Sequence, residues 1–260
     1  NAQYTLSPYQ NIYAGWAQSY RPVILKDIVP ASTFEIVDDD LRDADGYNLE
    51  IGYRGMSGKL RWDISAFQVR YNNRLGMLVE NDNEGNTLYR RTNIGNSETR
   101  GLEAFIEYFL PFENLNVSVF SSTAWQDARY RDASIRVGDR NEDISGNKVE
   151  SVPELISRNG VNVRFSFGSL SLLYSYTGET YADALNTETP PPSGAVGLVP
   201  SYALLDLNTT WRLSPALQLR VNVNNLTDKQ YFTKRPQFYP GPGIWPSDGR
   251  SITVTFGISL

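Results

Sequence analysis

The chain has 260 residues, a formal net charge of −5 at neutral pH, and no Cys or His. This composition excludes Cys or His nucleophiles, His general bases, disulfides and thiolate or imidazole metal sites. The acidic balance argues against nucleic acid as a partner, because binding phosphate requires a basic surface. At this length we expect one domain, residues 1–260. No apolar run reaches the roughly 18 residues that a membrane-spanning helix requires.

Apolar and polar side chains alternate with a period of two residues along most of the chain, which predicts β-strands. A preceding strand ends within residues 1–6, and ten complete strands follow at 9–20, 46–55, 59–72, 97–109, 114–127, 157–167, 169–178, 201–213, 216–225 and 250–260. Between Leu60-Trp62-Ile64 and Phe67-Val69-Tyr71 the alternation slips by one residue. This slip predicts a β-bulge near Ser65.

The connections between these strands alternate in length. Short turns fall at 55–58, 111–114, 168–169 and 214–215, and long loops at 21–45, 73–96, 128–156, 179–200 and 226–249. Several strands reach about 11 residues, the length that a tilted strand needs to cross a bilayer. Short periplasmic turns and long external loops are typical of outer-membrane barrels. A soluble β-sandwich is the alternative, but its loops are usually far shorter. We therefore predict an all-β, transmembrane antiparallel β-barrel in the cell outer membrane, with a periplasmic C-terminus.

The alternation also predicts which side chains face lipid. On the segment 216–225 we expect Leu217, Leu219, Val221 and Val223 to point outward and their polar neighbours inward. Rings with a polar tip suit the membrane–water interface. An aromatic girdle is therefore predicted from Tyr9, Tyr13, Trp16, Tyr20, Tyr108, Trp125, Tyr174, Tyr176, Tyr181 and Tyr202.

Five motifs resemble those of TonB-dependent receptors, and they occur in the order that the family has. They are the aromatic–Arg–Pro step that closes 11–22, the strand 46–54 with Glu50, the Gly-x-Glu step within 98–103, the Asn-Leu-x-Asp-Lys segment within 222–231, and the final strand with Gly257. Leu260 departs from the family, in which an aromatic residue usually ends the chain. The segments 19–23 and 239–250 resemble the ferric-citrate branch most.

The resemblance implies a receptor that imports a ferric chelate, with ferric citrate or another siderophore as the ligand. Complete members have an N-terminal plug and 22 strands, so this chain would supply about the last ten. It begins without Met, and we interpret it as a processed chain or a fragment. The implied partners are the plug and remaining barrel strands, TonB through the N-terminal part, and membrane lipid or lipopolysaccharide. No cofactor is implied, because the ligand carries the iron.

In the ferric-citrate branch, arginines and polar side chains of the outer loops grip an anionic chelate. Arg suits carboxylates because its planar group donates two parallel hydrogen bonds. The predicted ligand-binding residues are Arg21, Gln126, Arg129, Arg131, Arg235 and Gln237. Arg129 and Arg131 form the densest arginine cluster together with Arg136 and Arg140. The alternative interpretation is a solvated loop of mixed charge, because Asp127, Asp132, Asp139, Glu142 and Asp143 are interleaved with the arginines.

The remaining carboxylates of the sequence do not predict a metal site or a catalytic site. The run Asp38–Asp45 lacks the Gly and distal Glu of an EF-hand, which favours a solvated acidic loop over a calcium site. Glu50, Glu103 and Glu107 fall on strands, where we expect them to face a polar lumen rather than to perform acid–base catalysis. No enzyme activity is therefore expected. Open alternatives are a passive porin, a structural or adhesive barrel, and a TonB-dependent receptor for a corrinoid or an oligosaccharide.

Overall fold

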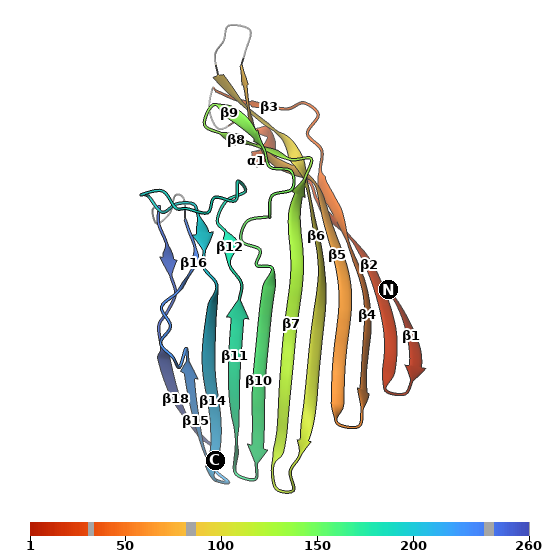
Figure 1. Ribbon diagram of the computed structural model, residues 1–260, viewed down its shortest axis with the longest axis vertical. Helices are drawn as coiled ribbons and strands as arrows, with labels where there is room; N and C mark the ends of the chain where they lie inside the picture. The colour runs from red at the N-terminus through yellow and green to blue at the C-terminus, as the bar shows by residue number, and fades with distance from the viewer. Residues whose placement is uncertain (31–33, 82–86, 237–241, 260) are drawn as a thin grey trace.

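The computed structural model describes residues 1–30, 34–81, 87–236 and 242–259. One antiparallel meander dominates it, with each strand hydrogen-bonded to the next along the chain (Figure 1). Its strands are β1 (Ala2–Ser7), β2 (Gln10–Arg21), β4 (Ala44–Ser57), β5 (Leu60–Asn81), β6 (Thr87–Pro111), β7 (Asn116–Arg131), β10 (Leu155–Phe165), β11 (Gly168–Thr177), β14 (Tyr202–Ser214), β15 (Leu217–Asn224) and β18 (Ser251–Ile258). All ten predicted strands are confirmed, except that Leu260, the last residue predicted for the final strand, lies outside the described residues. β1 is the strand whose end the sequence indicated.

The remaining elements are short and lie within the long connections. They are α1 (Leu25–Ile28), β3 (Glu35–Val37), the β8–β9 hairpin (Ser134–Val137 and Arg140–Asp143), and the pairs β12–β13 (Thr180–Tyr181 and Leu198–Val199) and β16–β17 (Phe232–Lys234 and Trp245–Pro246). β3 pairs in parallel with β6. No helix among the described residues has the length and apolar character that crossing a membrane requires.

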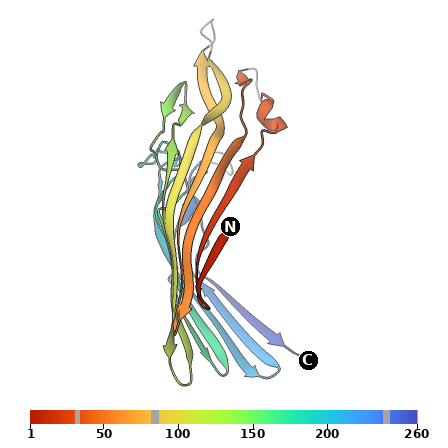
Figure 2. The same cartoon turned by 90° about the vertical axis from the view of Figure 1, so that its right-hand side faces the viewer.

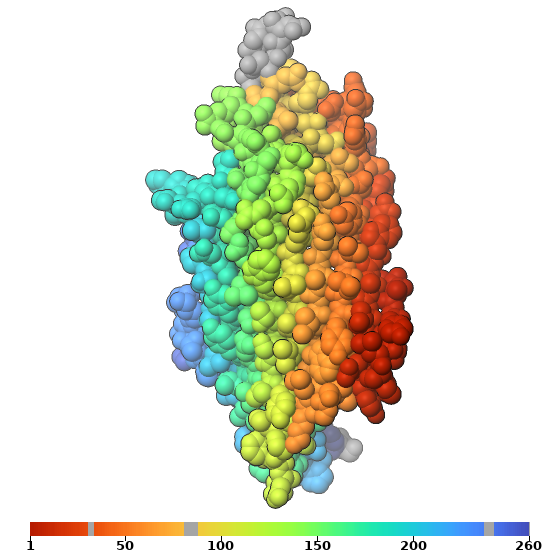
Figure 3. Space-filling model, turned by 45° about the vertical axis from the view of Figure 1, so that its right-hand side comes forward, coloured from red at the N-terminus to blue at the C-terminus, as the bar shows by residue number. Residues whose placement is uncertain are grey.

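The sheet is tall and curved, with tight turns at one end and long loops at the other (Figures 1 and 2). In the space-filling view, successive hairpins lie side by side across the surface (Figure 3). Among the described residues β1 pairs only with β2, and β18 pairs only with β15. The sheet is therefore an open part of a barrel wall, because both of its edges keep unpaired backbone groups.

The predicted bulge near Ser65 is wrong. Ser65 pairs with Gly52 on one side and Glu103 on the other, within an unbroken register. The irregularity lies higher, between Tyr71 and Leu75, where Asn73 adopts a φ of 56°. Beyond it, β5 and β6 continue as a paired hairpin through most of the segment that the sequence predicted as a loop, 73–96.

The two faces of the sheet differ in composition. Tyr13, Glu50, Asp63 and Arg158 line one pocket and therefore share a face, which we call the polar face. Residues one position along each strand point the other way, to the apolar face. The registers place Leu219 opposite Phe256, and Val221 opposite Val254, on this apolar face. The predicted alternation of the last strands is thus present in the structure.

Aromatic rings gather at two levels of the apolar face. Trp16, Trp125 and Tyr174, all of the predicted girdle, are between 44% and 60% exposed. Tyr108, also of the predicted girdle, is 41% exposed and lies near the short turns, opposite Leu60. A second group, not predicted, lies at the short-turn end, where the centroid of Phe165 is 4.6 Å from that of Phe167 and 5.4 Å from that of Trp211. Tyr13 and Tyr202 do not belong to the girdle: Tyr13 lines the pocket of the polar face, and Tyr202 stacks on Tyr231.

A small core of buried side chains lies at the long-loop end. Tyr130, Ala133 and Ile144 are at most 3% exposed, and Ile135, Val149 and Ala184 pack against them. The long strands form a single curved layer, and the described side chains that pack around this core belong to the loop end. The conventional packing of this chain therefore serves to order its loops.

Gly101 should not tolerate a side chain. A Cβ at Gly101 would lie 2.5 Å from the ring of Phe67 and 2.6 Å from the backbone oxygen of Trp125, and the backbone cannot yield. We expect Gly101→Ala to lower the free energy of unfolding by about 1–3 kcal/mol through overpacking. The measurement is urea unfolding of the full-length receptor in bilayers.

The matched control is Gly257→Ala, because a Cβ there would meet Gln218 no closer than 3.8 Å. Both glycines lie within strands, so the change in strand propensity is the same. Equal destabilisation by the two substitutions would show that close packing at Gly101 is not the cause.

Candidate ligand site at the long loops and on the polar face

Arg21, the first predicted ligand-binding residue, lies at the loop end of β2. Alternation along the strand places it on the polar face, like Tyr13. Its guanidinium donates to both carboxylate oxygens of Asp27, at 3.2 and 3.0 Å. The backbone N–H of Ile24, together with Arg21, holds the pKa of Asp27 below its usual value. Arg21 thus lies on the polar face and already has a carboxylate partner.

Arg129 and Arg131 are four and six residues after Trp125 on β7. Because side chains in a strand alternate between the two faces, both lie on the apolar face with Trp125. Arg129 pairs with Asp127 at 2.9 Å and donates to the backbone oxygen of Gly146. Arg131 pairs with Glu98 on β6 at 3.3 Å. These two arginines therefore point away from the polar face, and each is paired with a carboxylate on the apolar face.

Gln126, Arg235 and Gln237 complete the predicted set. Gln126 lies on the polar face of β7 and donates to the backbone oxygen of Pro153 at 3.0 Å. Arg235 donates to the backbone oxygens of Leu198 and Gly194, each at 3.0 Å. It therefore joins two long loops. Gln237 lies outside the described residues. The structure does not gather the described candidates into one cluster, but Arg21 and Gln126 share the polar face.

The long loops are held together around β5 and β6. The side chain of Asn141, on β9, accepts from the backbone N–H of Val79 and donates to its oxygen, at 2.6 and 2.9 Å. The guanidinium of Arg136 lies over the ring of Tyr89, 3.4 Å from its centroid. These contacts fix the β8–β9 hairpin against β5 and β6, so the rim of the barrel wall is preorganised at this point.

The acidic segment 38–45 braces the same rim. Asp38 accepts from the hydroxyl of Thr92 at 2.7 Å, and the carboxylate of Asp43 accepts from the backbone N–H of Val23 at 2.7 Å. Thr92 and its neighbours hold the pKa of Asp38 below its usual value. Among the described residues, no three His, Cys, Asp or Glu side chains are placed to share a metal ion. These carboxylates thus connect segments of chain.

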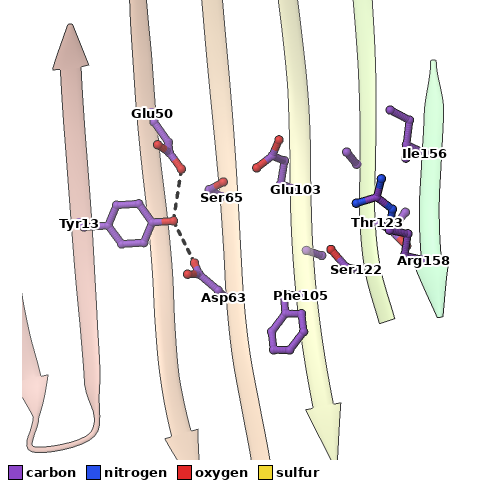
Figure 4. A pocket seen from close by; sticks show the side chains of 12 residues that line it. Tyr13, Glu50, Asp63, Ser65, Glu103, Phe105, Ser122, Thr123, Ile156 and Arg158 are labelled. Carbon is purple, nitrogen blue, oxygen red and sulfur yellow. Dashed lines mark hydrogen bonds between the residues drawn. The ribbon is translucent and has the colours of Figure 1, made fainter. Parts of the chain in front are cut away.

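A pocket of about 390 Å³ lies on the polar face between β2 and β10 (Figure 4). The hydroxyl of Tyr13 is 2.9 Å from Asp63 and 3.3 Å from Glu50, and it can donate its one proton to either carboxylate. Glu103 projects into the same pocket from β6, and Arg158 from β10. Three carboxylates face one guanidinium here, so the pocket is suited to a cationic group.

The sequence placed two of these residues correctly and missed the others. Glu50 and Glu103 were expected to face a polar lumen, and both line the polar face; Glu107, expected there too, lines a second pocket beside Arg164. Tyr13 was assigned to the girdle, and Asp63 and Arg158 were not singled out. The parity of Ile12, Ala14 and Trp16 on β2 was the signal that Tyr13 faces the other way.

Comparisons with known proteins were made by sequence and by structure. The family model described as "TonB dependent receptor-like, beta-barrel" matches residues 1–226. A probable TonB-dependent siderophore receptor, PiuA of Acinetobacter baumannii, is 32% identical over 79 residues, which cover 30% of this chain and 9% of that protein.

Among solved structures, the unliganded ferric citrate transporter FecA superposes with a TM-score of 0.77 and 22% identity over 98% of this chain. The siderophore receptor PiuA from Acinetobacter baumannii gives a TM-score of 0.72 and 20% identity over 98% of this chain. The copper transporter OprC gives 0.68 and 15% over 99%. The chain spans 37%, 34% and 38% of those three chains, respectively. At these identities the likeness shows the fold alone.

Proposed function

The chain belongs to the TonB-dependent receptor-like β-barrel family, and on this basis we propose that it forms the C-terminal part of an energy-coupled outer-membrane receptor that imports a ferric chelate. Ferric citrate is the leading ligand, and other siderophores come next. The observation that carries the proposal is the barrel wall itself: one face is apolar, the other is charged, and long ordered loops stand at one end only. Such a wall encloses a polar interior and presents a rim to ligands from outside.

The choice of ligand rests on chemistry rather than on fold. The fold is shared with a copper transporter, so it does not select among ligands. The sequence offers neither Cys nor His to bind a bare soft metal. Anionic chelates instead require guanidinium and amide donors. Arg21 and Gln126 present these donors on the polar face near the rim, and Arg235 presents a guanidinium in the loop between β16 and β17. We assign the first contacts with the chelate to these three residues.

The acidic pocket suits a role in holding a plug. Uncompensated charges inside a barrel are costly once another domain excludes water from them. Glu50, Asp63 and Glu103 outnumber Arg158 in the pocket, so a plug that fills the barrel should place cationic side chains there. A pull on the plug from TonB would break these pairs and open the interior. The plug, the other barrel strands and TonB are thus the proposed protein partners.

The orientation of the chain in the membrane follows from the lengths of its connections. The short turns would lie in the periplasm together with the C-terminus, and the long loops would face outward. The apolar face would contact lipid and, near the rim, lipopolysaccharide. Arg131, which lies on this face and is 44% exposed at its side chain, would then meet lipopolysaccharide rather than the imported ligand.

Calorimetry on the full-length receptor with ferric citrate tests the proposal. A desolvated Arg that donates to a carboxylate contributes on the order of 1.5–3 kcal/mol through charge-assisted hydrogen bonds. Arg21→Ala or Arg235→Ala should therefore weaken binding about tenfold to a hundredfold. Arg131→Ala is the control, because its side chain lies on the apolar face.

Two results would contradict the proposal. One is an unchanged affinity in both the Arg21 and the Arg235 variants. The other is a wild-type receptor that binds a neutral corrinoid or oligosaccharide and no ferric chelate. A receptor that binds nothing, and conducts small solutes without energy, would instead be a passive barrel.

A further inference from the structure

The charges of the polar face are unevenly distributed around the barrel wall. The five strands β10, β11, β14, β15 and β18 contain one carboxylate, that of Asp206. This carboxylate accepts from the backbone N–H of Asn225 at 2.7 Å. By contrast, the polar face of β4, β5 and β6 carries Glu50, Asp63, Glu103 and Glu107. Arg54 and Arg61 share this face, and Arg61 lies 3.9 Å from Glu107, so four carboxylates outnumber two guanidinium groups here. The other half of the wall is nearly free of acids.

In the second half the arginines outnumber the carboxylates. The polar face also carries Arg158, Arg164, Arg212 and Arg220. Residues paired across neighbouring strands share a face, and the pairs Arg164–Ser169, Ser169–Thr210 and Thr210–Arg220 extend the face of Arg158 to β15. Arg220 donates to the side chain of Gln218 at 3.2 Å. Within the described residues, no ion pair reaches the guanidinium of Arg164, Arg212 or Arg220. Their positive charge is therefore not neutralised by the wall itself.

A row of neutral hydrogen-bonding side chains crosses this half of the wall without a break. Each member stands directly opposite the next on the neighbouring strand, from β7 to β18: Ser118, Asn162, Ser171, Asn208, Asn222 and Thr253. Ser171 donates to Asn162 at 2.7 Å. The next row toward the short turns runs from Asn116 to Thr255 and contains Arg164 and Arg220. The first row lies between the acidic pocket and these arginines.

We propose that this face of β10, β11, β14, β15 and β18 is the surface along which an anionic chelate moves from the rim to the short-turn end. The inference rests on the proposed function, because it requires an anionic cargo. Amide and hydroxyl groups can replace water around carboxylates without adding negative charge. Rings of Arg favour anions in pores, and passage requires several weak sites rather than one tight site. The acidic half repels the same cargo and favours a cationic plug surface.

The structure supports several weak sites along this surface. A pocket of about 430 Å³ between β6 and β11 contains Asn116, Ser118, Asn162, Arg164 and Ser171. It holds one unpaired guanidinium among neutral donors and acceptors, and Glu107 marks its boundary with the acidic half. Arg220 lies in the same row as Arg164, and Arg212 lies one row nearer the short turns. An anion could therefore pass from one guanidinium to the next.

The test is uptake of iron-55 citrate by cells that carry the full-length receptor. The double variant Asn208→Asp/Asn222→Asp places two negative charges in the neutral row. We expect binding at the rim, measured without energy, to stay within about twofold, and the energised uptake rate to fall about tenfold because the charges repel an anion in transit. Asn208→Gln/Asn222→Gln, which adds no charge, should keep the wild-type rate.

The matched control is Asn11→Asp, which makes the same chemical change on the acidic half, where Arg54 donates to Asn11 at 3.0 Å. It should leave uptake unchanged. Equal uptake by the wild type and the Asp double variant would overturn the path and leave the proposed function standing. Equal loss in the Gln and Asp double variants would also overturn it, because charge would then not be the cause. A wild type that neither binds nor takes up ferric citrate or any other ferric chelate would overturn the proposed function itself.

Discussion

Replacing Val221 by Arg should lower the free energy of unfolding by roughly 2–4 kcal/mol, the cost of a cationic side chain on the lipid face at mid-membrane. Val221 lies in the middle of β15, between Thr209 on β14 and Val254 on β18. Its side chain is on the apolar face, where no water can solvate a guanidinium. The measurement is a urea titration of the full-length receptor folded into phospholipid bilayers.

Asn222→Arg is the control for this prediction, because Asn222 is the next residue and lies at nearly the same depth on the polar face. Its stability should change far less, since the interior can hydrate a charge. Single Cys residues provide a second measurement: a lipid-soluble label should react at positions 219 and 221 and not at 220 and 222. Reversed labelling, or a larger cost at Asn222, would mean that the two faces have been exchanged.

The strands were predictable because one physical cause acts along the whole chain. A wall between lipid and a polar interior requires side chains of opposite character at successive positions, so the period of two is strong in every spanning segment. β15 shows this most clearly, with Leu219 and Val221 against Arg220 and Asn222. The lengths of the connections then fixed the order of the hairpins. Neither feature depends on contacts between distant parts of the chain.

The bulge was mispredicted because an aromatic ring was taken as evidence of an apolar environment. Phe67 lies on the polar face, over Gly101 of the neighbouring strand, where the missing side chain leaves room for its ring. Tyr13 lies over Gly52 in the same manner. A ring can therefore face the interior wherever a glycine stands opposite. That pairing joins two strands, so the sequence of one strand does not reveal it.

The ligand site was less predictable than the fold. Residue type selected Arg129 and Arg131, but the alternation that located β7 also places both beside Trp125, on the apolar face. Asp127 and Arg129 are two residues apart and hence on one face, which explains their ion pair. Other loop arginines donate to backbone oxygens, as Arg235 does to Gly194. Such contacts depend on how the loops fold, and no local pattern encodes them.

The arrangement of the loops depends on a buried ion pair that the sequence did not indicate. Arg91 on β6 pairs with Glu35 on β3, whose side chain is 3% exposed, and also donates to the backbone oxygen of Lys26. Together these contacts hold β3 and α1 against the β5–β6 hairpin. A carboxylate so placed has little access to water and depends on its cationic partner.

Arg91→Ala should therefore release the segment that contains α1 and β3 from the β5–β6 hairpin. Removing one member of a buried pair typically costs about 3–5 kcal/mol, and we expect the lower end because Arg91 is itself 18% exposed. A local opening made easier by about 3 kcal/mol is roughly a hundredfold more populated. Trypsin should then cleave after Lys26 about a hundred times faster in the folded receptor, as followed by mass spectrometry.

The neighbouring Arg90→Ala provides the control, because it removes the same side chain and the same trypsin site from the same strand. Arg90 pairs with Glu80 and, at 3.8 Å, with Asp38, but these groups are 31–45% exposed at their side chains. Solvent screens such pairs, so cleavage after Lys26 should barely change. If both variants are cleaved at the wild-type rate, the loop is held by the backbone pairing of β3 with β6 and not by Glu35. If both are cleaved equally fast, the loss of either positive charge is sufficient and burial of the carboxylate is not the cause.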